Sequence, residues 1–435
     1  MTAPTENRAT RLVCLVTPGH LATNPRLVKE ADALVAAGYR VCVIACDYIA
    51  WAREAEAEFA DRPWSVANRV RFGPLAPLHV RIRHALVMRG ARFLFKAGLR
   101  GLAVATRAWN PVAPDLVSAA LRVRADLYIA HYPAALPAAA AAAARHRTLY
   151  AFDAEDFHPG DTPDRPKFAV DKAILRVIEG GLLPGAVHVS AASPGISAAY
   201  ADVYGIARPA TVLNVFPKSH APAAPTDRGD AHARPSVYWF SQTIGPDRGI
   251  ECAVRAISIS RVRPHLYLRG TISDAYRESL LELARTTGAE GHVHFFPPAA
   301  PSEMERLAAH HDAGLCGETG HSANRRIALT NKIFTFLLAG IPVLLSAIPA
   351  HSDIVADLGP AATLYDVDDA DSLAAAYDAM LQDPARLEAA RCHAWKLGQD
   401  RYNWDREQAT LVRLVDRSLG ITAGGTANSE RTGHT

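Results

Sequence analysis

The sequence predicts an α/β fold made of two doubly wound domains, one behind the other in the chain. Short apolar strands alternate with helical patterns almost throughout, which is typical of parallel sheets covered by helices on both faces. A polar, proline-rich segment at 217–235 interrupts this alternation and has the composition of an interdomain linker. The 435 residues suffice for two domains with their own cores. Because such sheets bind ligands at the carboxyl ends of their strands, we expect a ligand cleft between the domains.

The first domain is predicted at 1–216 and opens with a strand–loop–helix unit. A strand at Leu12–Val16 leads into a loop, and Asn24 then caps a helix that has Pro25 at its first position. Gly38 ends this helix in the way that glycine commonly ends helices. Further strands of this domain are predicted at 40–45, 126–130, 148–152, 187–191 and 211–215.

The second domain is predicted at 236–400. Helical patterns separate its predicted strands, which are 237–241, 265–269, 293–296, 313–316, 341–345 and 362–365. An amphipathic helix follows at 401–420, and we expect it to pack back on the first domain. The tail at 421–435 has the composition of a disordered segment.

Composition argues against several classes of protein. The formal net charge of +3 is nearly neutral and no binding module stands out, so we expect no nucleic-acid partner. No apolar run approaches the ~20 residues that span a bilayer, and the polar N-terminus does not resemble a signal peptide. The six cysteines form no CxxC pair and have the pattern of reduced core thiols. We therefore expect a cytoplasmic protein.

One stretch of the first domain, 69–107, is strongly basic and carries no acidic residue, while apolar residues interleave with its cations. It is either a solvated helical face or a surface that meets anionic lipid or a phosphorylated acceptor. We expect it to lie beside the acceptor side of the cleft and to make the protein peripheral at the inner face of a membrane. Its nine cations are Arg69, Arg71, Arg81, Arg83, Arg89, Arg92, Lys96, Arg100 and Arg107.

The segment 331–346 predicts an apolar helix followed by a buried strand. Thr330 occupies the N-cap position and Gly340 the position just after the helix. Lys332 then falls in the first helical turn, where acidic residues are usually favoured. A cation added to free backbone N–H groups suits a diphosphate ligand, although a solvated lysine at a helix end would give the same pattern.

A second loop, SQTIGPDRGIE, has matching chemistry. It follows the strand at 237–241, its glycines Gly245 and Gly249 allow a tight turn, and Arg248 reaches the start of the next helix. Arg248 and Lys332 thus occupy equivalent places at one edge of one sheet. Two such cations would neutralise the charge on a departing nucleoside diphosphate without a metal ion. No paired aspartates stand out at these strand ends, so we expect no metal site.

Segments from both halves of the chain carry one collective resemblance. They are TNPRLVKEADALVAAGYRVCVI, ADLYIAHY, LYAFDAEDFH, GPDRGIE and NKIFTFLLAGIPVLLS. Together they resemble the retaining, GT-B-fold glycosyltransferases of the large family that contains sucrose synthase and phosphatidylinositol mannosyltransferases. The resemblance implies two Rossmann-like domains facing across a cleft. It also implies a nucleotide-diphosphate sugar as the donor substrate, with no further cofactor.

The resemblance assigns roles to matching positions. Arg248 and Lys332 would hold the donor diphosphate, and His131, which could otherwise be a core histidine, would lie near the donor sugar. Gly19 would let the backbone approach the phosphate, and Glu318 would contact sugar hydroxyls. The other expected donor-side residues are Gln242, Gly245, Asn331 and Thr335. The expected acceptor-side residues are Asn24, Arg26, Asp153 and Glu155, of which the two carboxylates could equally form a solvated turn.

Four positions depart from the family pattern. Gln242 stands where many members carry an arginine, and Ala154 replaces a histidine. Thr335 stands where the family has the glutamate that binds the nucleotide ribose. Ile327 stands at the position of an earlier glutamate. Loss of the ribose-binding carboxylate would cost about 1.5–3 kcal/mol of donor binding.

The sequence therefore predicts a metal-independent, retaining glycosyltransferase. Its acceptor would be a saccharide, a lipid-linked saccharide or a natural-product aglycone. One alternative is a catalytically impaired homologue that acts as a binding or scaffold partner, which the departures at Thr335, Gln242 and Ile327 favour. A further alternative is a nucleotide-sugar 2-epimerase, for which only Asp153 and Glu155 could act as acid and base.

Overall fold

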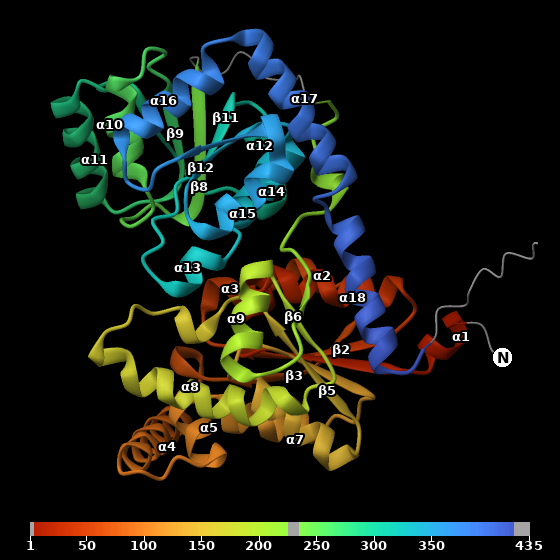
Figure 1. Cartoon of the computed structure of the whole chain (residues 1–435). Helices are drawn as coiled ribbons and strands as arrows, with labels where there is room; N and C mark the ends of the chain where they lie inside the picture. The colour runs from red at the N-terminus through yellow and green to blue at the C-terminus, as the bar shows by residue number, and fades with distance from the viewer. Residues whose placement is uncertain (1–3, 225–234, 422–435) are drawn as a thin grey trace, which may run out of the picture.

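The computed structural model describes residues 4–224 and 235–421 as two α/β domains, the second above the first in Figure 1. Each domain is built on its own parallel sheet. The predicted fold class is therefore confirmed. Most of the predicted linker and the predicted disordered tail from 422 onward lie outside the described residues.

The first domain contains seven parallel strands in the spatial order β3-β2-β1-β4-β5-β6-β7. Along the chain they are β1 (Leu12–Val16), β2 (Arg40–Asp47), β3 (Ser65–Arg71), β4 (Leu127–His131), β5 (Leu149–Ala154), β6 (Val189–Ala191) and β7 (Ala210–Thr211). Helices cover both faces, so successive side chains of β1 enter different cores. Val13 and Leu15 pack on one face, and Cys14 and Val16 pack on the other.

The helices of the first domain surround this sheet. They are α1 (Pro4–Ala9), α2 (Pro25–Ala36), α3 (Ala50–Ala55), α4 (Leu78–Lys96), α5 (Leu102–Trp109), α6 (Ala113–Ala120), α7 (Leu136–His146), α8 (Ala169–Leu182) and α9 (Pro194–Tyr204). Helix α2 begins where the sequence predicts, because Asn24 Oδ1 accepts a hydrogen bond from the backbone N–H of Leu27 at 3.1 Å. Its residues Leu27 and Leu34 then pack on the same face of the sheet as Val13.

The second domain contains six parallel strands in the order β10-β9-β8-β11-β12-β13. They are β8 (Ser236–Thr243), β9 (His265–Thr271), β10 (Val293–Phe296), β11 (Ala313–Cys316), β12 (Val343–Ser346) and β13 (Ala362–Tyr365). One face is covered by α10 (Ile250–Ile259), α11 (Asp274–Thr287) and α16 (Ala370–Leu381). The other is covered by α12 (Met304–Ala308), α14 (Asn331–Ala339) and α15 (Pro349–Leu358).

Two strand predictions in the first domain need correction. Strand β3 was not predicted, because it is an edge strand whose residues are mostly exposed and carry no apolar run. The strand predicted at 211–215 is largely wrong, since β7 ends at Thr211. The chain leaves the sheet there because the carbonyl of Val212 accepts a hydrogen bond from Arg26, and Leu213 N–H donates to Glu407 at 2.8 Å.

The strand predicted at 341–345 begins two residues later, at Val343. Gly340 has φ +72° and ends α14 in the left-handed conformation that the sequence predicts. The backbone N–H of Ile341 donates to the carbonyl of Phe336 at 3.0 Å, which closes the helix terminus before the strand can start.

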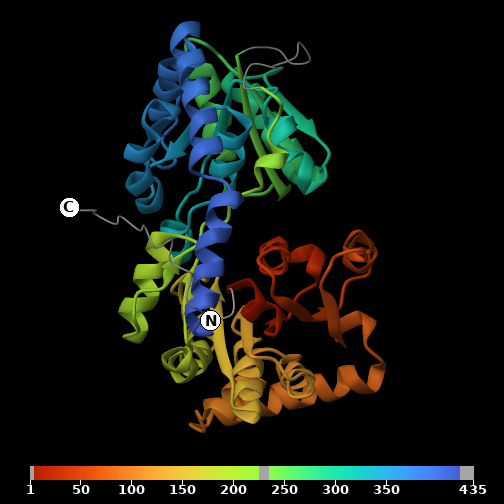
Figure 2. The ribbon, with the colours of Figure 1, turned by 90° about the vertical axis from the view of Figure 1, so that its right-hand side faces the viewer.

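The chain crosses back to the first domain at its C-terminal end. Helix α17 (Pro384–Asp400) packs on the second domain, and α18 (Trp404–Ser418) runs down beside the first, as Figures 1 and 2 show. Val415 of α18 enters the core that contains Leu27. Asp416 pairs with Arg8 at 2.7 Å, and Trp404 N–H donates to the carbonyl of Phe216. These contacts join the two domains on one side.

Candidate functional site

Both sheets reverse their strand order in the middle, between β1 and β4 in the first and between β8 and β11 in the second. In doubly wound sheets, ligands bind outside the carboxyl ends of such a pair of strands. The ends of these four strands and the loops that follow them contain Gly19, His131, Arg248 and Glu318. They define the candidate site.

Lys332 forms a buried ion pair in the second domain. Its Nζ donates to Glu318 Oε1 at 3.1 Å, and both side chains are 7% exposed. Nζ also lies 3.3 Å from Thr330 Oγ1 and 5.5 Å from the centre of the Trp239 ring. Thr330 therefore receives a bond from Lys332 and makes no side-chain cap of its own. Burial alone would raise the pKa of Glu318, but Lys332 and Arg325 outweigh it and lower the pKa to about 2.

Arg248 lies directly before Gly249, at the start of α10. Gly249 has φ +70°, and a Cβ there would lie 2.4 Å from the carbonyl oxygen of Gly317, so only glycine fits. Thr319 Oγ1 donates to the Asp247 carbonyl at 3.2 Å, which joins the same two loops a second time. Within residues 4–224 and 235–421, the half-buried guanidinium of Arg248 has no hydrogen bond or ion pair. It is available to an anionic ligand.

A polar cavity of about 180 Å³ lies between the domains. Its polar lining comes from both domains: Glu155, Asp156 and Asn214 of the first, and Glu318, Arg325, Thr330 and Asn331 of the second. Three of the predicted site residues, Glu155, Glu318 and Asn331, thus meet in one place. A larger cavity of about 310 Å³ opens elsewhere between the domains, beside Leu213 and Tyr402, but it contains neither Arg248 nor Lys332.

The short helix α13 (Ala323–Ile327) fixes the second domain against the first at the edge of this cavity. Asn324 is 1% exposed; its Oδ1 accepts from Phe157 N–H and its Nδ2 donates to Asp156, both at 2.8 Å. The backbone of Ile327 accepts from Ser193 Oγ at 2.7 Å. The domain contact is therefore held by specific hydrogen bonds and is closely packed.

Sequence reasoning missed Asn324 and also its neighbour Arg325, which adds a cation to the cavity. Arg325 Nη1 lies 3.9 Å from Glu318 Oε2. The available signal was Ser322, which caps α13 by accepting from the Arg325 N–H at 3.2 Å and so predicts a helix start in this loop. With Lys332 and Arg248, Arg325 makes a third cation at this edge of the second sheet.

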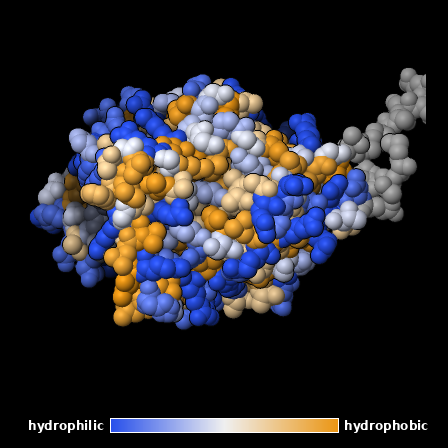
Figure 3. Space-filling model, turned by 90° about the horizontal axis from the view of Figure 1, so that it is seen from below, coloured by the Kyte–Doolittle hydropathy of each residue, from blue (hydrophilic) through white to orange (hydrophobic). Residues whose placement is uncertain are grey.

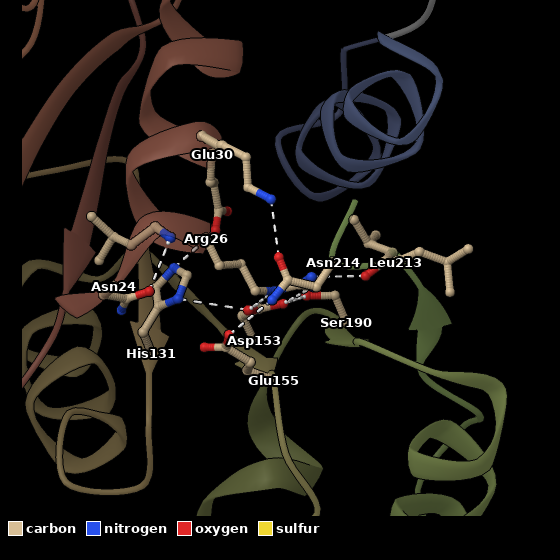
Figure 4. A network of polar contacts seen from close by, with 12 residues as sticks. Asn24, Arg26, Glu30, His131, Asp153, Glu155, Ser190, Leu213 and Asn214 are labelled. Carbon is tan, nitrogen blue, oxygen red and sulfur yellow. Dashed lines mark hydrogen bonds and ion pairs between the residues drawn. The ribbon is translucent and has the colours of Figure 1, made fainter. Parts of the chain in front are cut away.

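The predicted acceptor-side residues divide into three buried ones, Asn24, Arg26 and Asp153, and the half-buried Glu155. Arg26 and Asp153 form a two-bonded ion pair at 2.6 and 2.8 Å, and Ser190 Oγ donates to Asp153 at 2.5 Å, as Figure 4 shows. Burial opposes ionisation, but Arg26 holds the pKa of Asp153 well below its usual range. Because Asp153 is 2% exposed, it is not the solvated turn that its spacing allowed. It is part of the core, whereas Glu155 lines the cavity.

Glu155 is held at the cavity by two polar neighbours. Its Oε2 accepts from the Tyr132 hydroxyl at 3.2 Å. Its Oε1 accepts from Asn214 Nδ2 at 3.1 Å (Figure 4). Tyr132 has φ +67°, a conformation that is rare for residues other than glycine and is often retained at functional sites. Burial, and then the nearby carboxylates, raise the pKa of Glu155 despite Arg26.

His131 ends β4 as predicted, but it faces the interior of the first domain. It is 1% exposed, with Nε2 2.8 Å from Glu30 and Nδ1 3.6 Å from Asp153. Burial opposes protonation, yet these carboxylates raise the pKa of His131 above its ordinary value. His131 therefore orders the network that supports the cavity and does not line the cavity itself. Its partner Glu30 has no signal in the sequence beyond its place on α2.

The structure leaves other predicted residues in simpler positions. Asn24 is the buried cap of α2. A Cβ at Gly19 would make only ordinary contacts, at 3.4 Å or more, so the protein itself does not require glycine there. Gln242 is exposed at the end of β8, and a Cβ at Gly245 would meet nothing within 4 Å. The open space at Gly245 leaves room for a ligand.

Thr335 does not face open space. It is fully buried, and its Oγ1 donates to Glu305 Oε1 at 3.3 Å. Glu305 comes from α12 and is also fully buried, with His220 Nδ1 3.6 Å from its other oxygen. Position 335 therefore has no carboxylate of its own, but Glu305 places one beside it. No pattern in the sequence indicated this neighbour.

Two clusters of buried side chains could offer three metal ligands each within the described residues. They are Glu30, His131 and Asp153, and His20, Asp47 and Glu56. In both, protein groups already occupy ligand atoms. Asp153 binds Arg26, and in the second cluster Glu56 accepts from the backbone N–H of Leu21 at 2.6 Å and pairs with Arg69. These contacts give both clusters a structural role.

Comparison with known proteins finds no matching family model and no matching curated protein. Solved structures do match. HepE from Anabaena in complex with UDP and glucose has a TM-score of 0.68 at 14% identity, covering 94% of this chain and 100% of that one. Sucrose-phosphate synthase from Thermosynechococcus elongatus has a TM-score of 0.70 at 14% identity, with 95% and 100% covered. A glycosyltransferase from Rickettsia africae has a TM-score of 0.66 at 11% identity, with 95% and 99% covered.

These identities are low, but the matches extend over nearly the whole of each chain. This chain likewise has two α/β domains, each built on its own parallel sheet. The chain therefore has the GT-B fold, in which two Rossmann-like domains face each other across a cleft.

Proposed function

We propose that the protein transfers a sugar from a nucleotide-diphosphate sugar to an acceptor. The observation that carries this proposal is the convergence of Lys332, Arg248 and Arg325 at the carboxyl edge of the second sheet, beside the interdomain cavity. The structural neighbour HepE was crystallised with UDP and with UDP-glucose, which supports a donor of this class.

The cations suit the charge that develops when the sugar leaves its diphosphate. Lys332 is buried, so its field is weakly screened, and Glu318 holds it in place before the donor binds. A diphosphate beside Nζ would accept a hydrogen bond from Lys332 while Glu318 accepts another. Arg248 has no partner among the described residues that it would have to release first. Both side chains would stabilise the leaving group more than the intact donor, which is what accelerates the reaction.

The remaining polar groups suit sugar recognition. Glu318, Asn331 and Asn214 offer hydrogen-bond donors and acceptors around one small cavity. Hydroxyl groups of the donor sugar would bind on the side of Glu318, and the acceptor would approach from Glu155. We propose that transfer retains the anomeric configuration and needs no metal ion, since three cations lie around the loop at 317–318 and could neutralise the diphosphate.

In this proposal the first domain binds the acceptor. A saccharide, a lipid-linked saccharide and a natural-product aglycone all present hydroxyl groups that Glu155 and Asp156 could bind. The lipid-linked class is favoured by the exposed apolar and basic surface of α4, whose outward residues include Leu86 and Phe93.

A catalytically impaired homologue is the second candidate. Thr335 is committed to Glu305, and Ile327 packs against Gly195, where a Cβ would lie 2.7 Å from the Ile327 carbonyl oxygen. Neither position offers a carboxylate to a nucleotide. Such a protein would bind a partner and release no nucleoside diphosphate. An epimerase is less well supported, because Asp153 is already paired with Arg26. Of the two carboxylates that could act as acid and base, only Glu155 is then available.

Release of nucleoside diphosphate tests the proposal. The protein is incubated with UDP-, GDP- and TDP-sugars, beginning with UDP-glucose, with and without candidate acceptors. A transferase releases nucleoside diphosphate together with a glycosylated product. An impaired homologue releases none with any donor, and an epimerase changes the donor sugar while the diphosphate stays attached.

A further inference from the structure

We propose that helix α4 docks the protein on an anionic membrane surface, lying flat with one apolar face in the lipid. Membrane docking goes beyond the proposed sugar transfer and does not depend on it. The partner is a lipid bilayer that carries anionic headgroups. The argument rests on which side chains α4 exposes, which it buries, and how their charges are paired.

The outward face of α4 is apolar. Leu78, Ile82 and Leu86 follow at intervals of four residues, and Phe93 lies on the same side two turns further on. Their exposures are 67%, 51%, 64% and 72%. Single exposed hydrophobic residues are ordinary on protein surfaces, but a continuous row along one helix marks an interaction site.

The opposite face of α4 already packs on its own domain. His84, Ala91 and Phe95 are buried, and Ala91 and Phe95 belong to the core beneath the first sheet. The helix is therefore anchored and cannot turn its outward row inward. Its apolar face needs a partner outside the described residues.

The cations of the basic stretch border this row, and the fold changes how many of them are free. Arg69, Arg83 and Arg92 pair with acidic residues from other segments, so these three cations are compensated even though the stretch itself carries no acidic residue. Six have no ion pair with a described residue: Arg71, Arg81, Arg89, Lys96, Arg100 and Arg107. Arg89 and Lys96 lie on the outward side of α4, beside the apolar row.

This charge pattern selects the partner. A second protein copy or a neutral apolar ligand would gain little from the cations, whereas anionic headgroups would pair with them while the acyl region receives Leu86 and Phe93. No helix of the described part of the chain is long and apolar enough to cross a membrane. The contact would therefore be interfacial.

The position of α4 leaves the interdomain site accessible. The helix runs along the bottom of the first domain, away from the second (Figures 1 and 2). Seen from below, apolar side chains form a column at the left of the molecule, bordered by hydrophilic ones (Figure 3). The basic stretch was expected beside the cleft, but its helical part lies at the far end of the domain, so that expectation needs correction.

Vesicle sedimentation tests the proposal with the full-length protein. We expect binding to vesicles that contain an anionic phospholipid, no binding to neutral vesicles, and at least a tenfold weakening in about 0.5 M salt. Leu86→Ser with Phe93→Ser should weaken binding at least about tenfold, because two apolar insertions are lost. Arg89→Ser with Lys96→Ser should weaken binding to anionic vesicles to a similar extent.

A matched control lies on the second domain, where Leu281→Ser with Arg255→Ser removes one exposed apolar and one exposed basic side chain. This variant should bind vesicles like the wild type. All substituted side chains are exposed, so the thermal midpoints should stay close to that of the wild type, which separates loss of docking from loss of folding.

Three results would overturn the proposal: equal binding to anionic and neutral vesicles, no binding at low salt, or unchanged binding of both α4 variants. Light scattering would identify the rival partner. If the wild type is a dimer that Leu86→Ser with Phe93→Ser dissociates, and vesicles are not bound, the face joins two copies. Because vesicle binding needs no donor, failure of sugar transfer leaves this test intact, and the reverse also holds.

Discussion

Lys332 and Glu318 form an ion pair in which Nζ lies 3.1 Å from Oε1 and both side chains are almost fully buried. A buried pair of this kind brings little net stability, because desolvation costs about as much as the attraction gains. Its presence at a helix start, beside a polar interdomain cavity, is better explained by a ligand that needs a preorganised cation.

The first prediction concerns Arg248→Ala. Turnover should fall by roughly 10²–10³-fold, because one preorganised charge partner of the leaving group is removed. Stability should change little, since the guanidinium has no partner among the described residues. The measurement is steady-state nucleoside diphosphate release beside a thermal melt, with Arg255→Ala on the following helix α10 as control. Wild-type turnover in Arg248→Ala would remove this residue from the site.

The second prediction concerns the pH dependence of stability. The pKa of Glu318 is lowered to about 2 in the folded protein, so its contribution is present above its unfolded pKa and is lost as pH falls toward 2. Glu318→Gln should cost about 3 kcal/mol at neutral pH, because it leaves Lys332 unpaired. The difference from the wild type should shrink below about pH 4.5.

Denaturant unfolding at several pH values measures this difference, with Glu282→Gln, an exposed partner of Arg285, as the control. The control should follow the wild type closely at each pH, because water already screens its ion pair. A Glu318→Gln deficit that is constant from neutral to acid pH would mean that the carboxylate is not held ionised by Lys332.

The third prediction concerns Thr335→Glu, which introduces the glutamate found at this position in the family that the sequence resembles. Here it should destabilise the protein by about 3 kcal/mol or more, because the new carboxylate would be buried beside Glu305. The exchange of both residues, Thr335→Glu with Glu305→Thr, should recover most of the loss. Thermal or denaturant unfolding measures both variants. An equally stable single variant would show that the two positions are not coupled.

The fourth prediction concerns metal ions. Turnover should persist in excess EDTA, because Lys332, Arg248 and Arg325 supply the positive charge that a metal would otherwise bring to the diphosphate. The assay is donor turnover before and after chelation. Complete loss that Mg²⁺ or Mn²⁺ restores would reveal a metal-dependent step.

Much of the fold could be predicted because its signals are local. Asn24 and Pro25 start α2 through one side-chain bond, and Gly340 ends α14 because it adopts φ +72°. The placement of Lys332 follows from the same helix boundaries. The short edge strand β3 and the truncated β7 carried no comparable pattern, since exposed or two-residue strands show no apolar run.

The partners of the site residues could not be predicted, because they come from distant segments. Arg26 meets Asp153 across 127 positions, and Asn324 meets Phe157 across 167. Periodicity also does not say which of two apolar faces is buried. On α4 the row that contains Phe95 enters the core, and the row that contains Phe93 stays outside. Only the packed structure distinguishes them.

The most direct test of the account is the release of nucleoside diphosphate by the wild type and by Lys332→Ala, each incubated with the same sugar donor and acceptor. The account predicts release with product by the wild type, and roughly 10²–10³-fold slower release by a folded Lys332→Ala variant. Equal release by both proteins would contradict the role of Lys332. No release by the wild type from any donor would contradict sugar transfer and favour the binding partner.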